Sequence, residues 1–146
     1  MRKEELFLGA WIYIFSYDNL EKSIPVQVKG VFENDNGVVY VEFVLNGERG
    51  SRPLSDCRPI FINNDIMEHN GWNTTSGYVT HQLDYDDRMW MEYYPFERRL
   101  RKYSLIKDEW DNDSKERKTL FQCHCTYVHE LQKGLEMSGS CLEIKM

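Results

Sequence analysis

The chain has 146 residues and a mass of 17.5 kDa, which predicts one domain or two small units that share a core. Aromatic residues make up 14% of it and the broad hydrophobic set 41%, which excludes a disordered tail, and its 9 glycines and 4 prolines follow no collagen-like period. The 18 basic and 24 acidic residues give a net charge of −6, opposite in sign to that of most proteins that bind by neutralising phosphates.

The first apolar run, Leu6 to Phe15, follows Arg2 and Lys3 and has the outline of a secretory signal. Gly9 and several aromatic residues interrupt the run, no small-residue cleavage site follows it, and it is far shorter than the roughly 20 residues that span a bilayer. We therefore expect a first strand here, apolar on both faces, in a soluble cytoplasmic protein without membrane contact.

Short strands joined by tight turns are expected in the rest of the first half. Residues 24–31 and 38–45 alternate apolar and polar side chains, and residues 57–62 read as a further short strand. The dipeptides Asn36-Gly37 and Asn46-Gly47 are typical of hairpin turns. Such strands within about sixty residues predict a small SH3-like barrel.

A short helix is expected after the barrel, with Asn63 as its N-cap and Gly71 after its end. Ile66, Met67 and Trp72 would dock this helix onto the barrel. The polar loop 73–77 is then the expected boundary, so the predicted units are residues 1–72 and 73–146.

The second half is expected to be an antiparallel meander followed by one main helix. Its β-prone segments are residues 78–85, 88–94, 96–106 and 117–125. Val128, Leu131 and Leu135 have helical spacing, and residues 141–146 are expected to form a final strand. The predicted fold class is α+β, mostly β, with an SH3-like N-terminal barrel packed on an α+β C-terminal half.

Three strings mark the start, middle and end of the chain: Leu6-Phe7-Leu8-Gly9-Ala10-Trp11-Ile12, then Pro59-Ile60-Phe61-Ile62-Asn63 through Gly71-Trp72, and Tyr127-Val128-His129-Glu130-Leu131-Gln132. Together they resemble a family of small uncharacterised proteins of Bacteroides-type gut bacteria and their phages or mobile elements. Asn63 stands where that family has a capping Thr, Lys133-Gly134 replaces a more apolar continuation, and residues 78–122 lie outside the resemblance. The resemblance implies a compact SH3-like N-terminal half and no established activity.

The possible metal ligands are soft side chains near the end of the chain: Cys123, His124, Cys125, His129 and Cys141. Structural zinc prefers paired Cys-x2-4-Cys or His-x3-5-His knuckles, and neither occurs here. Cys123 and Cys125 would instead share one strand face as small buried hydrophobes. No nucleophile elbow, phosphate-binding loop or His-Glu-x-x-His motif is present, so we expect no catalytic residue, no metal and no cofactor. A metal- or thiol-dependent enzyme that uses Cys123, Cys125 and His129 ranks last among the hypotheses.

The most informative segment is basic: residues 97–107 carry a local net charge of +4, and the adjoining residues 108–116 carry −4. Arginine forks pair with phosphate or carboxylate, and aromatic rings stack on bases. The expected ligand-binding residues are Arg98, Arg99, Arg101, Tyr103 and Tyr94. The alternative is that the basic strand and the acidic loop neutralise each other across a hairpin, which would leave no anion site.

These observations predict a non-catalytic binding or interaction protein. Its partner would be a small anionic, nucleotide-like ligand or another protein. Nucleic-acid binding through the same residues is the alternative, and the net charge of −6 disfavours it. The oligomeric state, the identity of the partner and the pathway are not predicted by the sequence.

Overall fold

The chain is grouped by its contacts into two units in the computed structural model, which describes residues 1–15, 22–74, 79–82, 89–107 and 115–146. The first unit consists of residues 1–61, 127–129 and 146, and the second consists of residues 62–126 and 130–145. The change between units therefore falls at Phe61 and Ile62 rather than in the polar loop 73–77. As a result, the helix after Asn63 belongs with the second unit and not with the N-terminal sheets.

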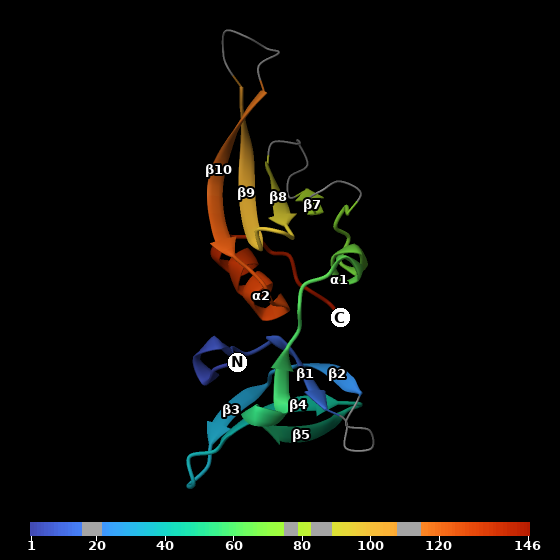
Figure 1. Cartoon of the computed structure of the whole chain (residues 1–146), viewed down its shortest axis with the longest axis vertical. Coiled ribbons are helices and arrows are strands. Elements are labelled where there is room, and N and C mark those ends of the chain that lie inside the picture. Colours follow the sequence, from blue (N-terminus) through green and yellow to red (C-terminus); the bar gives the residue numbers. More distant parts are fainter. Residues whose placement is uncertain (16–21, 75–78, 83–88, 108–114) are drawn as a thin grey trace. The chain divides into compact units, whose positions relative to one another are not determined.

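The first unit is built from two three-stranded antiparallel sheets (Figure 1). One sheet has the order β2-β1-β6, with β1 at Trp11–Phe15, β2 at Ser23–Gln27 and β6 at Cys57–Pro59. The other has the order β3-β4-β5, with β3 at Gly30–Glu33, β4 at Val39–Leu45 and β5 at Glu48–Pro53. Two short 3-10 helices, η1 (Lys3–Glu5) and η2 (Leu54–Asp56), complete the unit.

One stretch of chain, residues 23–33, joins the two sheets. The Val28 N–H donates to the Ala10 carbonyl at 2.9 Å, and the Lys29 N–H donates to the Glu42 carbonyl at 2.8 Å. The same segment thus pairs with β1 at its start and with β4 at its end, as a strand of a small barrel does. The mostly β class is confirmed, but no ladder among the described residues closes the two sheets into a ring.

The two predicted hairpin turns are confirmed. Asn46 and Gly47 have φ angles of +52° and +80°, the left-handed pair that a type I′ turn requires. At the other turn the Asn34 Oδ1 accepts hydrogen bonds from the N–H groups of Asn36 (3.0 Å) and Val38 (2.9 Å). The strand β5 was not predicted, because its sequence Glu-Arg-Gly-Ser-Arg-Pro has no apolar alternation.

The first strand is shorter than predicted and is buried on one face only. It begins at Trp11, and its even-numbered residues are buried while Trp11, Tyr13 and Phe15 are half-buried. The sheet therefore has a single core face. The buried core of the unit comprises Ala10, Ile12, Ile14, Val26, Val28, Val41, Phe43 and Cys57.

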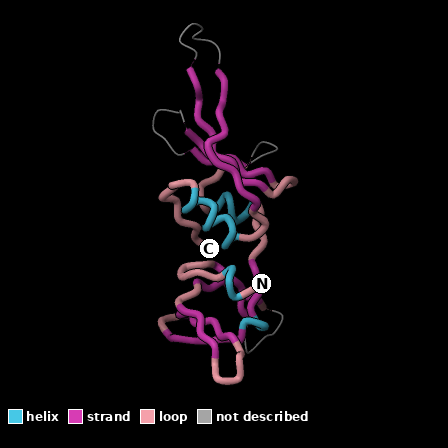
Figure 2. The backbone as a smooth tube through the Cα atoms, turned by 90° about the vertical axis from the view of Figure 1, so that its left-hand side faces the viewer, coloured by secondary structure: helices cyan, strands magenta, loops and turns pink. Residues whose placement is uncertain are grey.

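The second unit contains the predicted meander, a four-stranded antiparallel sheet of order β10-β9-β8-β7. Its strands are β7 (Val79–Gln82), β8 (Met89–Tyr94), β9 (Arg99–Lys107) and β10 (Lys115–His124). Figure 2 shows the long β9–β10 pair and the two helices, α1 (Asn64–His69) and α2 (Val128–Met137). Neither of these helices, in the part of the chain that the structure covers, has the length and apolar character to cross a bilayer.

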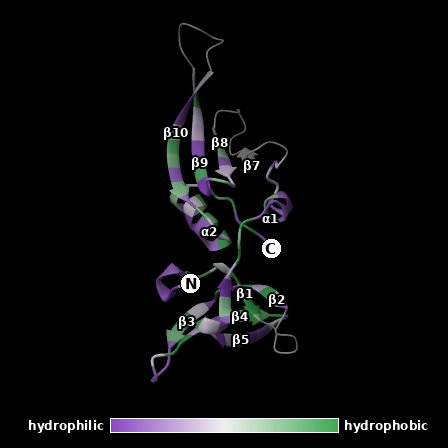
Figure 3. Ribbon diagram, viewed as in Figure 1, coloured by the Kyte–Doolittle hydropathy of each residue, from purple (hydrophilic) through white to green (hydrophobic). Residues whose placement is uncertain are grey.

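Helix α2 packs against one face of this sheet. Hydrophobic and hydrophilic residues alternate along it (Figure 3), and Leu131 and Leu135 are fully buried. The Lys102 Nζ donates to the Ser138 carbonyl at 2.9 Å at the end of the helix. Side chains alternate along a strand, so the residues beside Lys102 and Leu100 in sequence point to the opposite face of the sheet.

The short helix α1 is capped as predicted, since the Asn63 Oδ1 accepts a hydrogen bond from the Ile66 N–H at 2.9 Å. The expected final strand over residues 141–146 is wrong, because this segment forms no ladder. Its backbone is held by a side chain instead: the Asn70 amide donates to the Lys145 carbonyl at 2.8 Å and accepts from the Lys145 N–H at 2.7 Å.

Candidate functional site

The sheet face opposite α2 carries a cluster of arginine and aromatic side chains, which we call the arginine–tyrosine face. Register brings its members together across three strands, because Trp90 pairs with Tyr103, Glu92 with Arg101 and Tyr94 with Arg99. Directly opposed residues of an antiparallel pair share one face. The face consists of Trp90, Glu92, Tyr94, Arg99, Arg101, Tyr103 and Arg117.

A buried carboxylate organises the centre of this face. The side chain of Glu92 is 4% exposed, and it accepts hydrogen bonds from Trp90 Nε1 at 3.0 Å, from Arg117 Nη1 at 3.3 Å and from the hydroxyl of Tyr94. The hydroxyls of Tyr94 and Tyr103 are also hydrogen-bonded to each other, at 2.9 Å. A buried charge is tolerated when it is paired and hydrogen-bonded, so Glu92 fixes the position of the rings around it.

Two guanidinium groups lie on tyrosine rings of the face. The Arg101 guanidinium is 4.7 Å from the centre of the Tyr94 ring, and that of Arg117 is 4.4 Å from the centre of the Tyr103 ring. Arg101 also pairs with the exposed carboxylate of Glu97 at 3.1 Å. Both cations thus lie over ring faces while part of each remains in contact with solvent.

The surroundings raise the pKa of two members of this face, Arg101 and Tyr94. The hydroxyl of Tyr103 is the main group that raises the pKa of Arg101 above its usual range, and Tyr94 and Glu97 add to the effect. Burial, and then the hydrogen bond to Glu92, raise the pKa of Tyr94 above its usual range. Arg101 therefore stays a guanidinium cation and Tyr94 a neutral phenol at physiological pH.

The five residues expected to bind a ligand occupy different environments. Tyr94, Arg101 and Tyr103 are brought together, but Tyr103 is only 3% exposed and lies beneath Arg117. The Arg99 side chain is exposed and has no hydrogen bond or ion pair within the described residues. Arg98 is exposed in the turn before β9, with a φ of +53°. Most of the acidic loop 108–116, including Asp111 and Asp113, lies outside the described residues, so the competing hairpin pairing stays untested.

The sequence analysis missed Glu92, Trp90 and Arg117 as members of this face. Glu92 reads as an ordinary polar position in an alternating strand, and only the paired strands bring Trp90 and Arg117 to its carboxylate. The charge count along the chain was a partial signal, since it located Arg101. The charge count could not identify Arg117 as a partner across the sheet, because the loop 108–116 separates Arg117 from the basic segment in the sequence.

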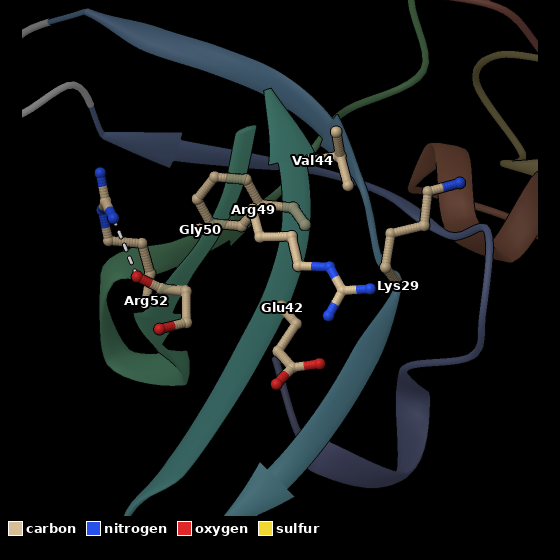
Figure 4. A pocket seen from close by; sticks show the side chains of 8 residues that line it. Lys29, Glu42, Val44, Arg49, Gly50 and Arg52 are labelled. Carbon is tan, nitrogen blue, oxygen red and sulfur yellow. Dashed lines mark hydrogen bonds between the residues drawn. The ribbon is translucent and has the colours of Figure 1, made fainter. Parts of the chain in front are cut away.

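A pocket lies in the first unit, on the β4–β5 hairpin and the segment that joins β2 to β3. Its cavity volume is about 700 Å³, within the range of small-molecule sites, and its charged lining comprises three cations and one carboxylate. Figure 4 shows Arg49 projecting between Lys29 and Arg52, with the Glu42 carboxylate next to it. The remaining lining residues are Phe43, Val44, Gly50 and Ser51. The sequence analysis missed this site, because its cations are separated in the sequence and gather only when the hairpin forms.

Two cysteine side chains meet beneath α2. The Sγ atoms of Cys123 and Cys125 are 3.5 Å apart, and a Cβ at Gly134 would lie 2.7 Å from the Cys123 sulfur. The two thiols point to the same side, as predicted, although β10 ends at His124 and Cys125 lies just beyond the strand. The absence of a side chain at residue 134 makes room for them. Among the described residues no group of three or more His, Cys, Asp or Glu side chains could hold a metal ion.

Comparison with known proteins adds no relative to this description: no protein-family model, curated protein or solved structure matches the chain. The resemblance to small proteins of Bacteroides-type bacteria therefore stays a prediction.

Proposed function

We propose that this protein is a non-catalytic binding protein and that its arginine–tyrosine face binds a planar anionic ligand of the nucleotide kind. The observation that carries the proposal is the stacking of Arg101 on Tyr94 and of Arg117 on Tyr103, on the sheet face that does not contact α2. A guanidinium already held over a ring is restricted in its motion, and its edge can receive a phosphate while a base stacks beside it.

Arg99 is the anion-binding residue of this proposal. Its side chain is exposed beside Tyr94, to which it is directly opposed across β8 and β9. Arg98 in the adjoining turn adds a second exposed cation. Arg101 would exchange its exposed partner Glu97 for the ligand at little cost, since surface ion pairs contribute little to stability. Tyr94, which donates to Glu92, and Tyr103, which is hydrogen-bonded to Tyr94, position these groups.

Single-stranded nucleic acid is the second candidate, because the stacked groups form a row across three strands. Aromatic sheet faces with flanking arginines bind single strands by stacking and by phosphate contacts. The net charge of −6 opposes long-range attraction of a polyanion. Electrostatic repulsion by the net negative charge is weaker for a small ligand than for a polyanionic strand, so the small ligand is favoured.

The test is a thermal-shift titration with adenosine triphosphate, together with a gel-shift titration with single-stranded DNA and RNA at low salt. Arg99→Glu changes the charge at an exposed position without removing a described contact. Lys118→Glu is the matched control: Lys118 is exposed and directly opposed to Ser104, so it lies on the other face of the same sheet and its substitution gives the same net charge.

The proposal expects stabilisation by the nucleotide, its loss in Arg99→Glu and its retention in Lys118→Glu. Retardation of single strands, lost in the same variant, would favour the second candidate. No stabilisation and no retardation, or an equal loss in both variants, would overturn binding at this face.

A further inference from the structure

The pocket of the first unit is a site independent of the arginine–tyrosine face. From its geometry we infer that it binds a small phosphorylated ligand that also carries hydroxyl or amino donors, a sugar phosphate being the simplest example.

Positive charge dominates the pocket although the whole chain is acidic. Lys29, Arg49 and Arg52 face a single carboxylate, that of Glu42, which leaves a local charge of +2 in a protein of net charge −6. A concave site whose charge opposes that of the molecule concentrates anions locally. The pocket is therefore matched to an anionic group rather than to a neutral or cationic one.

Two of these cations are available to a ligand. The side chains of Lys29 and Arg49 are exposed and form no hydrogen bond or ion pair within the described residues. Arg52 is held differently, with its Nη1 donating to the Ser51 carbonyl at 2.8 Å and its guanidinium 5.5 Å from the centre of the Phe43 ring. Lys29 and Arg49 would bind the phosphate, since charge-assisted hydrogen bonds to a dianion are the strongest available to them.

Glu42 determines which phosphorylated ligands fit. Its carboxylate lies over the backbone of β3, where a Cβ at Gly30 would be only 2.6 Å from Oε2. Among the described residues it forms no ion pair with Arg49, although both line the pocket. A carboxylate beside a phosphate site repels a bare anion but accepts hydrogen bonds from hydroxyl or amino groups. The lining therefore favours a phosphorylated ligand that also carries hydroxyl or amino hydrogen-bond donors.

The floor of the pocket is rigid, which preorganises it. Gly50 lies against the ring of Phe43, where a Cβ would come within 2.8 Å of Cε2, and Phe43 itself is buried. The type I′ turn at Asn46 and Gly47 fixes the hairpin that carries Arg49. Val44, which is 45% exposed, supplies an apolar surface beside the charged groups. A ligand would thus meet a preformed site and would order few groups on binding.

The experiment is an amide chemical-shift titration of the isotope-labelled full chain with glucose 6-phosphate and, separately, with inorganic phosphate. We expect saturable shifts at residues 29, 42–44 and 49–52, and tighter binding of the sugar phosphate than of phosphate. The double variant Lys29→Ala/Arg49→Ala should lose both ligands. Glu42→Gln should reduce the preference for the sugar phosphate at least threefold while phosphate binding is retained or strengthened.

Lys22→Ala is the matched control, since Lys22 is an exposed lysine of the same unit outside the pocket lining. Absence of saturable shifts with either probe, shifts spread over surface lysines in general, or equal weakening in Lys22→Ala would overturn the inference. Binding that persists in Lys29→Ala/Arg49→Ala but is lost in Arg99→Glu would also overturn it, while it would support the arginine–tyrosine face. The experiments can therefore overturn either of the two proposals without overturning the other.

Discussion

The guanidinium of Arg117 lies 3.3 Å from the carboxylate of Glu92, although the arginine side chain is 52% exposed and that of the glutamate only 4%. The two residues are on the non-adjacent strands β10 and β8, with β9 between them. The pair thus ties three strands together at the face where we place ligand binding. Its position makes it both a stabilising contact and a support for the tyrosine rings.

Replacement of Arg117 by Ala should lower the free energy of unfolding by about 1.5–3 kcal/mol, because it removes one charge-assisted donor from a buried carboxylate. Arg117→Lys should have a smaller effect, since it keeps the charge but not the guanidinium contact with the Tyr103 ring. Urea unfolding measures both variants. Lys118→Ala, on the opposite face of the same strand, should stay within about 0.5 kcal/mol of the wild type. Equal unfolding midpoints for the two alanine variants would contradict the role assigned to the pair.

Alkaline pH should destabilise the second unit through Tyr93. Its hydroxyl donates to the Cys125 carbonyl at 2.7 Å, and burial raises the pKa of Tyr93 to about 12. The unfolded chain has the usual tyrosine pKa of about 10, so the neutral form is favoured by folding. This contribution is complete below about pH 10 and is lost as the pH rises toward about 12.

Tyr93→Phe tests this expectation. It should cost about 1 kcal/mol at neutral pH through the lost hydrogen bond, and it should flatten the fall of stability between about pH 10 and 12. Unfolding midpoints measured across that range give the slope. Some slope should remain, because the pKa of Tyr94 is raised too. An unchanged slope in the variant would show that Tyr93 is not the group responsible.

The thiols should differ in their reactivity toward iodoacetamide. The hydrogen bond from Cys125 lowers the pKa of Cys123, whereas the hydrogen bond to Cys123, together with burial, raises that of Cys125. Burial raises the pKa of Cys57 to about 11. In a Cys141→Ser background, which removes the exposed cysteine, Cys123 should be alkylated first at neutral pH, because the thiolate is the reacting species.

Mass spectrometry of peptides from a time course identifies the labelled site. Cys125→Ala should slow the labelling of Cys123, since the donor that stabilises its thiolate is lost. Faster labelling of Cys57 than of Cys123, or a rate at Cys123 that is indifferent to Cys125→Ala, would refute this assignment of the thiol pair.

Gly50→Ala should destabilise the first unit by overpacking. The added Cβ would lie 2.8 Å from Cε2 and 2.9 Å from Cζ of the buried Phe43 ring, so the ring or the strand must shift. A loss of about 1–3 kcal/mol is expected for such overpacking. The neighbouring exposed position provides the control, where Ser51→Ala should change stability by less than about 0.5 kcal/mol.

A double-mutant cycle locates the cause. Phe43→Leu removes the atoms that the new Cβ would meet, so the combined variant should be less destabilised than the sum of the two single variants. Strict additivity would indicate that the cost of Gly50→Ala arises from the backbone rather than from contact with the ring.

Much of the local structure follows from the sequence because it depends on neighbours along the chain. The hairpin at Asn46-Gly47 and the cap at Asn63 each depend on a residue type whose backbone or side-chain preference acts over a few positions. Alternation located β4, and β-prone composition located β8 and β9. The strand β5 was not predicted, because its sequence has no apolar alternation. It forms only through pairing with β4.

For the helix α1, local sequence signals predict the helix but not the unit to which it belongs. Its cap and length agree with the sequence. Ile66, Met67 and Trp72 would be equally apolar against either unit, so the sequence could not show that the helix belongs with the second one. Segment 141–146 has strand-like residues, but Asn70 takes up the backbone groups of Lys145. Hydrophobicity indicates that a residue is buried and gives no information about its partner.

Some residues of the candidate sites were likewise identified from the sequence, and others only from the tertiary structure. The sequence alone identified Arg99, Arg101, Tyr94 and Tyr103 as an arginine and aromatic group, because they are close along one strand pair. Only the tertiary structure brought Glu92 to Arg117 across β9 and gathered Lys29, Glu42 and Arg49 around one cavity. Charge and ring type are properties of single residues, whereas a site depends on distances between residues that are far apart in the chain, and those are fixed only when the strands pair.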